Sequence, residues 1–244
     1  MEKKYIIEIA TSDFLTTRSA VEGGADRIEL CANLAEGGTT SSHGMIIKCR
    51  EAFNTPLYPI IRPRGGDFLY SKDEFGIMAN DIEFCKQLGC DGIVIGLLNI
   101  DGTIDMIRAG DLIETAYPMG VTFHRAFDRC HDPFIALEEL IEIGCERILT
   151  SGQQPAAPDG IELIAQLNKT ADERIIIMPG SGVRKENIKM IAEKTGCIEF
   201  HSSLRGKEKS KMEFIHPAFA DSMVSYTNNA INPEDVKMLK NEML

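Results

Sequence analysis

Ionisable side chains interrupt five apolar runs of this sequence, close to where each run ends. The runs begin near residues 5, 27, 57, 121 and 198, and the interrupting side chains are Glu8, Glu29, Arg62, His124 and His201. Buried parallel strands are normally near-continuous Val, Ile and Leu, so charged side chains within them point to a functional role. Carboxyl groups that meet beside an arginine acquire different pKa values, which suits general acid–base catalysis. A structural ion-pair belt inside the protein is the alternative.

A short loop after the third run combines two arginines with two glycines. Its sequence is Arg62-Pro-Arg-Gly-Gly-Asp-Phe68. Two guanidinium groups can grip an anion, proline stiffens the loop, and the glycines let a ligand approach the backbone closely. We therefore add Arg64 and Asp67 to the candidate ligand-binding residues. A tight turn with its arginines on the surface is the alternative.

Serine and glycine are concentrated in three later segments, residues 150–152, 179–182 and 201–203. Each segment follows a β-rich run, where backbone N–H groups at the start of a helix can bind phosphate. In parallel barrels the loops after the seventh and eighth strands often have this role. The segments predict an anion site, with the candidate residues Arg125, Ser151, Ser181, Gly182 and Ser202.

The absence of certain residue patterns disfavours two kinds of site, a Schiff-base lysine and a dedicated zinc centre. No lysine falls within an expected strand, which disfavours a Schiff-base aldolase. The sequence has no His-x-x-x-His or Cys-x-x-Cys pattern and therefore no signature of a dedicated zinc site. The residues specify no cofactor. A divalent ion bound by Glu8, Glu29, His124 or His201 from separate strands remains open.

The composition is that of a globular protein with an acidic surface. The 244 residues carry a formal net charge of −11. This charge disfavours nucleic acid or a membrane surface as a partner, because phosphate contacts need clustered cations. No apolar stretch reaches the length of a transmembrane helix. The seven scattered cysteines are typical of reduced thiols in the cytoplasm. With the arginine-rich loop, these features favour a small anionic ligand.

A glycine-led phrase recurs four times and indicates how the elements are arranged. It reads Gly-Ala-Asp-Arg-Ile-Glu-Leu from Gly24, and related phrases begin at Gly89, Gly144 and Gly196. Each glycine can end a helix in the left-handed conformation, and each precedes a β-rich run. The spacing corresponds to about two βα units. Four repeats therefore predict eight strands that alternate with helices.

The predicted fold class is α/β, a single (β/α)8 TIM-type barrel that spans residues 1–244 as one domain. Its strands are expected at Tyr5–Ala10, Arg27–Cys31, Leu57–Arg62, Gly92–Leu98, Val121–Arg125, Arg147–Ser151, Ile175–Pro179 and Ile198–Ser202. The clearest helix starts at the capping box Ser71-Lys-Asp-Glu74 and ends at Gly89. An open, doubly wound sheet is the alternative, but no strand precedes a Gly-x-Gly-x-x-Gly turn. The active site of a barrel lies at the C-terminal ends of its strands.

The segment after the last strand, residues 204–231, is too long for an ordinary connection. It begins with the cationic run 205–211 and continues with the apolar side chains of Met212, Phe214 and Phe219. We expect an extended loop that closes over the mouth as a lid, or packs against a second subunit of a homo-oligomer, most simply a dimer. A solvated tail is the alternative. Asn232-Pro233 then opens a terminal helix over residues 232–243.

Six blocks of the sequence, taken in order, resemble the CutC family. They are Glu22–Cys31, Glu36–Thr40, Ile61–Phe68, Val121–Asp128, Leu149–Gly152 and Glu199–Ser202. The resemblance extends from about residue 5 to about residue 205. It implies a cytoplasmic barrel that is connected with copper homeostasis, and it implies no particular reaction. The fourth block adds Asp128 to the candidate catalytic residues.

Copper(I) binding is implied by this resemblance alone, and Cys31 is the residue to which it can be carried over. The copper sites proposed in the family use thiols at the ends of the first two strands, whereas the first-strand position here is Ala10. Copper(I) prefers soft thiolates in pairs, so Cys31 as a small buried residue is an equal alternative.

Two functions therefore remain open. One is a copper-binding protein. The other is an enzyme with lyase, isomerase or hydrolase chemistry that acts on a small anionic, phosphorylated metabolite through its carboxylate, arginine and histidine side chains.

Overall fold

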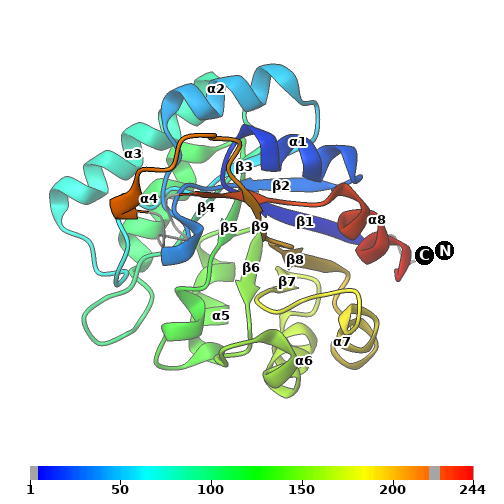
Figure 1. The fold of residues 1–244 in the computed structure, drawn as a ribbon. Helices are drawn as coiled ribbons and strands as arrows, with labels where there is room; N and C mark the ends of the chain where they lie inside the picture. The colour runs from blue at the N-terminus through cyan, green and yellow to red at the C-terminus, as the bar shows by residue number, and fades with distance from the viewer. Residues whose placement is uncertain (1–4, 220–225, 244) are drawn as a thin grey trace.

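A ring of parallel strands surrounded by helices forms the body of the protein (Figure 1). The computed structural model describes residues 5–219 and 226–243. Two parallel sheets, ordered β3-β2-β1-β8 and β4-β5-β6-β7, adjoin at a bridge between Ile60 and Val94 and where β7 lies against β8. The strands of the ring are β1 Ile6–Thr11, β2 Arg27–Leu30, β3 Leu57–Pro59, β4 Gly92–Ile95, β5 Gly120–Phe123, β6 Arg147–Thr150, β7 Ile176–Pro179 and β8 Glu199–Ser202. The predicted (β/α)8 barrel is confirmed.

Helices connect the strands and cover the outside of the ring. They are α1 Phe14–Glu22, α2 His43–Ala52, α3 Lys72–Gln87, α4 Met106–Ala116, α5 Pro133–Glu142, α6 Ile161–Ala171, α7 Ile188–Thr195 and α8 Pro233–Asn241. The predicted capping box opens α3: the Glu74 N–H donates to the Ser71 hydroxyl, and the Ser71 N–H donates to the Glu74 carboxylate. Within the described ranges, no helix is long and apolar enough to cross a membrane.

The repeated glycines end helices as predicted. Gly24, Gly89, Gly144 and Gly196 have φ values of +86°, +69°, +77° and +73°. They follow α1, α3, α5 and α7 and precede β2, β4, β6 and β8. Glycine alone adopts this left-handed conformation without strain from a side chain, so it can turn the chain from helix to strand within a few residues.

Two strands, β3 and β4, end three residues earlier than predicted, and the difference places residues on the rim. β3 ends at Pro59 rather than Arg62, because the Arg62 N–H donates to the Thr40 hydroxyl instead of to a neighbouring strand. β4 ends at Ile95 rather than Leu98, where the Leu98 N–H donates to the Phe68 carbonyl. The residues that follow both strands therefore belong to loops that surround the mouth of the barrel.

The segment after β8 contains a hairpin rather than the expected loop without strands. β9 (Gly206–Lys209) pairs antiparallel with β10 (Thr227–Ala230), and η4, a 3-10 turn, spans Pro217–Phe219 (orange in Figure 1). The Asn229 side chain donates to the Ser12 hydroxyl at 2.9 Å. The Arg205 guanidinium donates to the Leu34 carbonyl, also at 2.9 Å. Residues 220–225 of the expected lid lie outside the described residues. Closure over the mouth stays a prediction.

Candidate functional site

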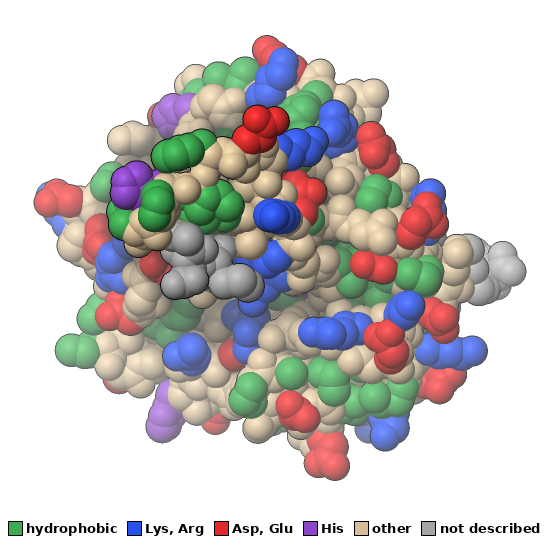
Figure 2. All heavy atoms as spheres, in the orientation of Figure 1, with side chains coloured by type: hydrophobic (Ala, Val, Ile, Leu, Met, Phe, Trp, Pro, Cys, Tyr) green, Lys and Arg blue, Asp and Glu red, His purple; other side chains and the backbone are tan. Residues whose placement is uncertain are grey.

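A pocket of about 1060 Å³ lies at the C-terminal ends of the barrel strands. Figure 2 shows a hollow in the face in view, in and around which Lys and Arg side chains gather. Glu29, Arg62, His124 and His201 line the pocket. The Glu8 side chain is fully buried beneath them and does not reach it. Four of the five predicted residues therefore share one pocket, and the fifth supports it from below.

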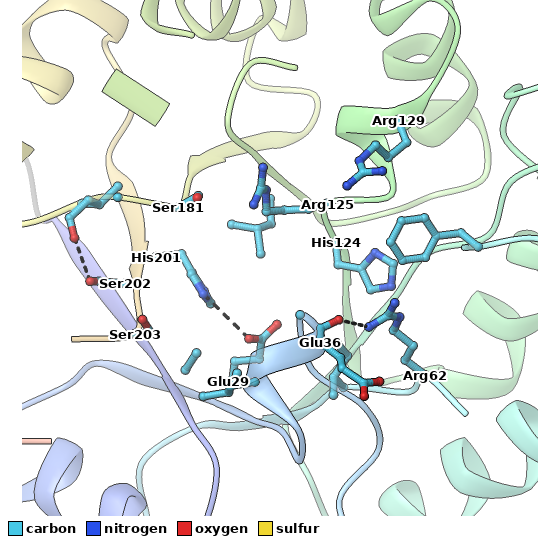
Figure 3. A pocket seen from close by; sticks show the side chains of 18 of the residues that line it. Glu29, Glu36, Arg62, His124, Arg125, Arg129, Ser181, His201, Ser202 and Ser203 are labelled. Carbon is cyan, nitrogen blue, oxygen red and sulfur yellow. Dashed lines mark hydrogen bonds and ion pairs between the residues drawn. The ribbon is translucent and has the colours of Figure 1, made fainter. Parts of the chain in front are cut away.

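The His201 imidazole lies between two carboxyl groups from neighbouring strands. Its Nδ1 is 2.7 Å from Oε1 of Glu8 on β1, and its Nε2 is 3.8 Å from Oε2 of Glu29 on β2. Figure 3 shows His201 and Glu29 facing each other across the floor of the pocket. The hydrogen bond with Glu8 fixes the orientation of the ring and puts the proton of a neutral imidazole on Nδ1. Nε2 is then free to accept a proton beside Glu29.

Burial and neighbouring charge give these three groups different proton affinities. Burial alone would raise the pKa of Glu8, but Arg27 and the hydrogen bond with His201 outweigh burial and hold that pKa well below its usual range. Burial raises the pKa of Glu29; His201 opposes this rise and the Glu8 carboxylate adds to it. Burial would lower the pKa of His201, but Glu29 and Glu8 outweigh it and raise that pKa. The Glu8 carboxylate, which stays ionised, thus orients His201, and His201 and Glu29 form a pair that can exchange a proton.

Below the pocket, a buried ion network fills the barrel. The Arg27 guanidinium forms ion pairs with Glu8 and with Glu199, the latter at 2.7 Å, and Arg147 reaches the same Glu199 carboxylate at 2.6 Å. The Tyr58 ring lies 5.2 Å from the Arg27 guanidinium carbon and 5.7 Å from that of Arg147. The ion-pair belt, which was the alternative to catalysis, therefore exists, and it lies one layer beneath the pocket.

Arg62 holds loops together instead of forming half of an anion grip. Its two Nη atoms donate, at 2.7–2.8 Å, to the backbone carbonyls of Glu36, Gly38 and Gly66. Arg64 is engaged too, by the carboxylates of Glu74 and, at 3.0 Å, of Asp67. Asp67 lines the pocket, whereas Arg64 does not. The predicted grip by both arginines does not form, because protein oxygens already occupy the Nη groups of Arg62 and the guanidinium of Arg64. The carboxyl groups of Glu8 and Glu29 do meet, on either side of His201, but the arginine that pairs with Glu8 is Arg27 rather than Arg62.

His124 is a neutral imidazole whose tautomer is fixed by the backbone. The Ala126 N–H donates to Nδ1 of His124 at 3.0 Å, so the proton of the ring is on Nε2. Burial, with a further contribution from the positive charge of Arg62, lowers the pKa of His124 to about 3. Gly96 makes room for the ring: a Cβ atom there would lie 2.2 Å from Cε1 of His124. The sequence analysis did not identify this role, because a glycine just after a strand resembles an ordinary turn residue.

Asp128 and Ser151 stabilise a loop rather than line the pocket. The Asp128 carboxylate accepts hydrogen bonds from the Thr150 hydroxyl at 2.6 Å and from the Ser151 N–H at 3.0 Å. Arg125 donates to Asp128 and to the Ser151 hydroxyl, both at 2.7 Å. Of these residues only Arg125 lines the pocket. The predictions of Asp128 as catalytic and Ser151 as ligand-binding are not supported by this position, because their polar groups satisfy one another.

The anion candidates near β7 and β8 line the pocket but offer backbone groups instead of hydroxyls. Ser181 Oγ donates to the Pro155 carbonyl at 2.9 Å, and Ser202 Oγ donates to the Val183 carbonyl at 2.8 Å. The N–H groups of Gly182 and Val183 donate to no group in the part of the chain that the structure describes. They are therefore available to an anion at the pocket wall.

Two arginines that the sequence argument missed have free guanidinium groups at the pocket. Arg129 and Arg184 line it, and neither side chain has a hydrogen-bond or ion-pair partner among residues 5–219 and 226–243. Arg184 could have been found, because it comes two residues after the predicted anion-binding Gly182. No predicted anion-binding residue lies as close to Arg129 in the sequence, so nothing pointed to it.

Cys31 is not arranged as a copper site. Its side chain is buried, and Sγ donates to Oε2 of Glu29 at 3.3 Å. Burial, together with the negative charge of Glu29, raises the pKa of the Cys31 thiol well above its usual range, which opposes the thiolate that copper(I) needs. Within the described residues, no three Cys, His, Asp or Glu side chains are grouped so that they could hold a metal ion.

Comparison with known proteins gives a consistent assignment. A protein of Chromobacterium violaceum that is described as a CutC family protein is 51% identical to this chain over 209 residues, which is 86% of this chain and 85% of that protein. A protein of Parabacteroides distasonis with the same description is 55% identical over 213 residues, which is 86% of this chain and 87% of that protein. A crystal structure from Streptococcus agalactiae, described as a copper homeostasis protein CutC, superposes with a TM-score of 0.77 at 32% identity and covers 82% of this chain and 98% of that one. The CutC family model matches residues 5–206, so the chain belongs to the CutC family.

Proposed function

We propose that this protein is an enzyme that transfers a proton within a small anionic metabolite bound at the mouth of the barrel. The observation that carries the proposal is the position of His201, held by the buried Glu8 on one side and facing Glu29 on the other. A carboxylate–imidazole pair beside a second carboxyl group is a common arrangement for general acid–base catalysis. A purely structural network would not need an imidazole nitrogen open to a pocket.

The charge around the pocket supports an anionic substrate. The protein carries a net charge of −11, yet six cationic side chains outnumber the five carboxyl side chains that line this pocket. The cations are Arg62, Arg125, Arg129, Arg184, Lys185 and Arg205. Cations with low-dielectric walls attract and retain anions. The free N–H groups of Gly182 and Val183, beside the unpaired Arg184, are the best-equipped place for a phosphate group. We therefore propose a phosphorylated metabolite.

A ligand screen tests the proposed function. Phosphorylated metabolites at about 100 times their Kd are expected to stabilise the protein by about 2.7 kcal/mol, seen as a rise in Tm. Arg184→Gln is expected to weaken the best ligand about tenfold, because a charged hydrogen bond of about 1.5 kcal/mol or more is lost. Arg18→Gln is the matched control, since Arg18 is exposed on α1 outside the pocket. If Arg184→Gln and Arg18→Gln bind that ligand equally well, the anion site is misplaced.

The family name suggests copper instead, and we propose that copper is not bound at Cys31. Cys31→Ser is expected to change copper(I) affinity by less than about tenfold, that is by less than about 1.4 kcal/mol, because no second thiolate adjoins the site. Competition with a copper(I) chelator measures this affinity. A tight one-to-one site that Cys31→Ser abolishes would contradict the prediction and restore the copper function.

We also propose a cytoplasmic location. All seven cysteines are free and buried, as expected of a chain kept in a reducing compartment.

A further inference from the structure

Two buried donors at one wall of the pocket have no acceptor. They are Nε of Arg62 and Nε2 of His124, and among the described residues no group accepts from either. Arg62 and His124 are only 3% and 5% exposed, and both line the pocket. Buried donors in native proteins are almost always satisfied, so an unsatisfied pair calls for an explanation. An acceptor atom of a bound ligand would satisfy both donors.

The unsatisfied nitrogen of His124 is a donor, not an acceptor. Because Nδ1 accepts from the Ala126 N–H, the single proton of the neutral ring is on Nε2. Since burial and Arg62 keep the pKa of His124 near 3, the ring stays neutral at physiological pH. A neutral imidazole N–H can donate a hydrogen bond to a developing oxyanion.

The two side chains that carry these donors pack against the same phenyl ring. The Phe68 ring lies 4.9 Å from the His124 ring and 5.0 Å from the Arg62 guanidinium carbon. Three backbone carbonyls fix the guanidinium, and the imidazole packs against Gly96, where a side chain would collide with the ring. Figure 3 shows Arg62 and His124 beside each other, with Glu29 and His201 on the other side of the pocket. Donors fixed before the substrate binds need no reorganisation as charge develops.

We propose that Nε of Arg62 and Nε2 of His124 bind the carbonyl oxygen of the substrate. The substrate is then a phosphorylated aldehyde or ketone that carries a hydrogen and a hydroxyl on the carbon next to the carbonyl. This inference rests on the proposed function and names its substrate class. Two N–H groups on neighbouring side chains suit one oxygen that gains negative charge, and the acid–base pair lies on the other side of the pocket. The phosphate would bind at the separate wall formed by Gly182, Val183 and Arg184.

The corresponding reaction is an isomerisation through an enediolate. The carbon next to the carbonyl loses its proton to the Glu29–His201 pair, and the electron pair of the broken C–H bond forms a carbon–carbon double bond. The carbonyl π electrons move to oxygen, where the Arg62 and His124 donors hold the charge. The same pair returns the proton to the former carbonyl carbon, while the proton of the neighbouring hydroxyl moves to the former carbonyl oxygen, so that the hydroxyl oxygen becomes the new carbonyl. No oxidant or reductant is consumed, so the step balances within the substrate.

Two probes that share a phosphate separate the carbonyl site from the anion site. Phosphoglycolohydroxamate carries a planar, oxyanion-like group that mimics an enediolate, whereas glycerol 3-phosphate has only tetrahedral carbons. The unmodified protein is expected to bind the hydroxamate at least about tenfold more tightly by calorimetry, and His124→Asn is expected to bind the two within about twofold. Asparagine can still accept from the Ala126 N–H, but it cannot replace the Nε2 donor. Arg184→Gln, as the control, is expected to weaken both probes by the same factor.

Nitrogen-15 spectra of the unmodified protein keep the inference testable if His124→Asn does not fold. The Nε2 resonance of His124 is expected to shift on binding the hydroxamate and to stay in place with glycerol 3-phosphate. Equal affinity for the two probes, or an unmoved Nε2 resonance, overturns the carbonyl site and leaves the anion site intact. If neither probe binds, the anion site of the proposed function fails, and the carbonyl inference fails with it.

Discussion

Arg27→Met is expected to lower the free energy of unfolding by about 3–5 kcal/mol. The guanidinium is 6% exposed and compensates two buried carboxylates, Glu8 and Glu199. Methionine fills a similar volume but leaves both negative charges without their shared partner in a low-dielectric interior. Urea denaturation at neutral pH measures the change.

An exposed ion pair provides the control for this substitution. Arg174 pairs with Glu138 at 2.7 Å, but its side chain is 43% exposed. Arg174→Met is therefore expected to cost less than about 1 kcal/mol. If Arg27→Met costs no more than Arg174→Met, the buried network is not what keeps Glu8 ionised. The positioning of His201 would then need another cause.

The order of layers inside the barrel explains why Glu8 and Glu29 differ although both interrupt strands. The β1–β2 register pairs Glu8 with Arg27, and Ala10 with Glu29. Glu8 therefore lies one layer deeper, beside an arginine, and Glu29 lies at the pocket. The sequence predicts that both side chains point inward, since alternation fixes the face of a strand. It does not predict the depth of each side chain, because depth depends on the stagger between strands.

The parts of the fold that follow from local chemistry were predictable. Left-handed glycines such as Gly89 and the capping box at Ser71 act over a few residues, so their sequence patterns mark the element boundaries directly. The ends of β3 and β4 were not, because Arg62 and Leu98 leave the sheet through hydrogen bonds with residues distant in sequence. The β9–β10 hairpin was missed for a related reason: its strands are exposed and polar, and lack the alternation that indicates a strand.

The location of the candidate site was predictable, but several roles within it were not. A charged residue at the C-terminal end of a barrel strand faces the mouth, which correctly placed Glu29, His124 and His201 at one pocket. Arg62 looked like an anion ligand because its partners, three backbone carbonyls, leave no mark in the sequence. Asp128 likewise satisfies N–H and hydroxyl groups of a loop more than twenty residues away. Backbone partners of this kind become visible only in three dimensions.

His124 and His201 are expected to titrate on opposite sides of the ordinary histidine pKa of 6.5. Burial and Arg62 lower the pKa of His124 to about 3, whereas Glu29 and Glu8 outweigh burial and raise the pKa of His201. In imidazole NMR spectra, His124 is expected to stay neutral at pH 4.5, and His201 is expected to stay protonated above pH 6.5. Such a pair supplies a neutral donor and a charged acid in the same pocket. A His124 resonance that titrates near pH 6.5 would contradict the buried, neutral ring.

The lowered pKa of His124 also makes the stability of the fold sensitive to acid. The folded-state pKa lies below the unfolded value of 6.5, so the contribution of this group is complete above pH 6.5 and decreases as the pH falls toward 3. Between pH 6.5 and 4.5 the loss is about 2 kcal/mol, because the slope approaches about 1.4 kcal/mol for each pH unit only below pH 6.5. His201 has the opposite sign: its contribution is complete below pH 6.5 and is lost as the pH rises through its raised pKa.

His124→Asn should remove the loss on the acid side and leave the alkaline loss unchanged. Urea denaturation of both proteins from pH 4.5 to 9 measures both slopes, and an unchanged acid slope in His124→Asn would assign the acid sensitivity to other groups.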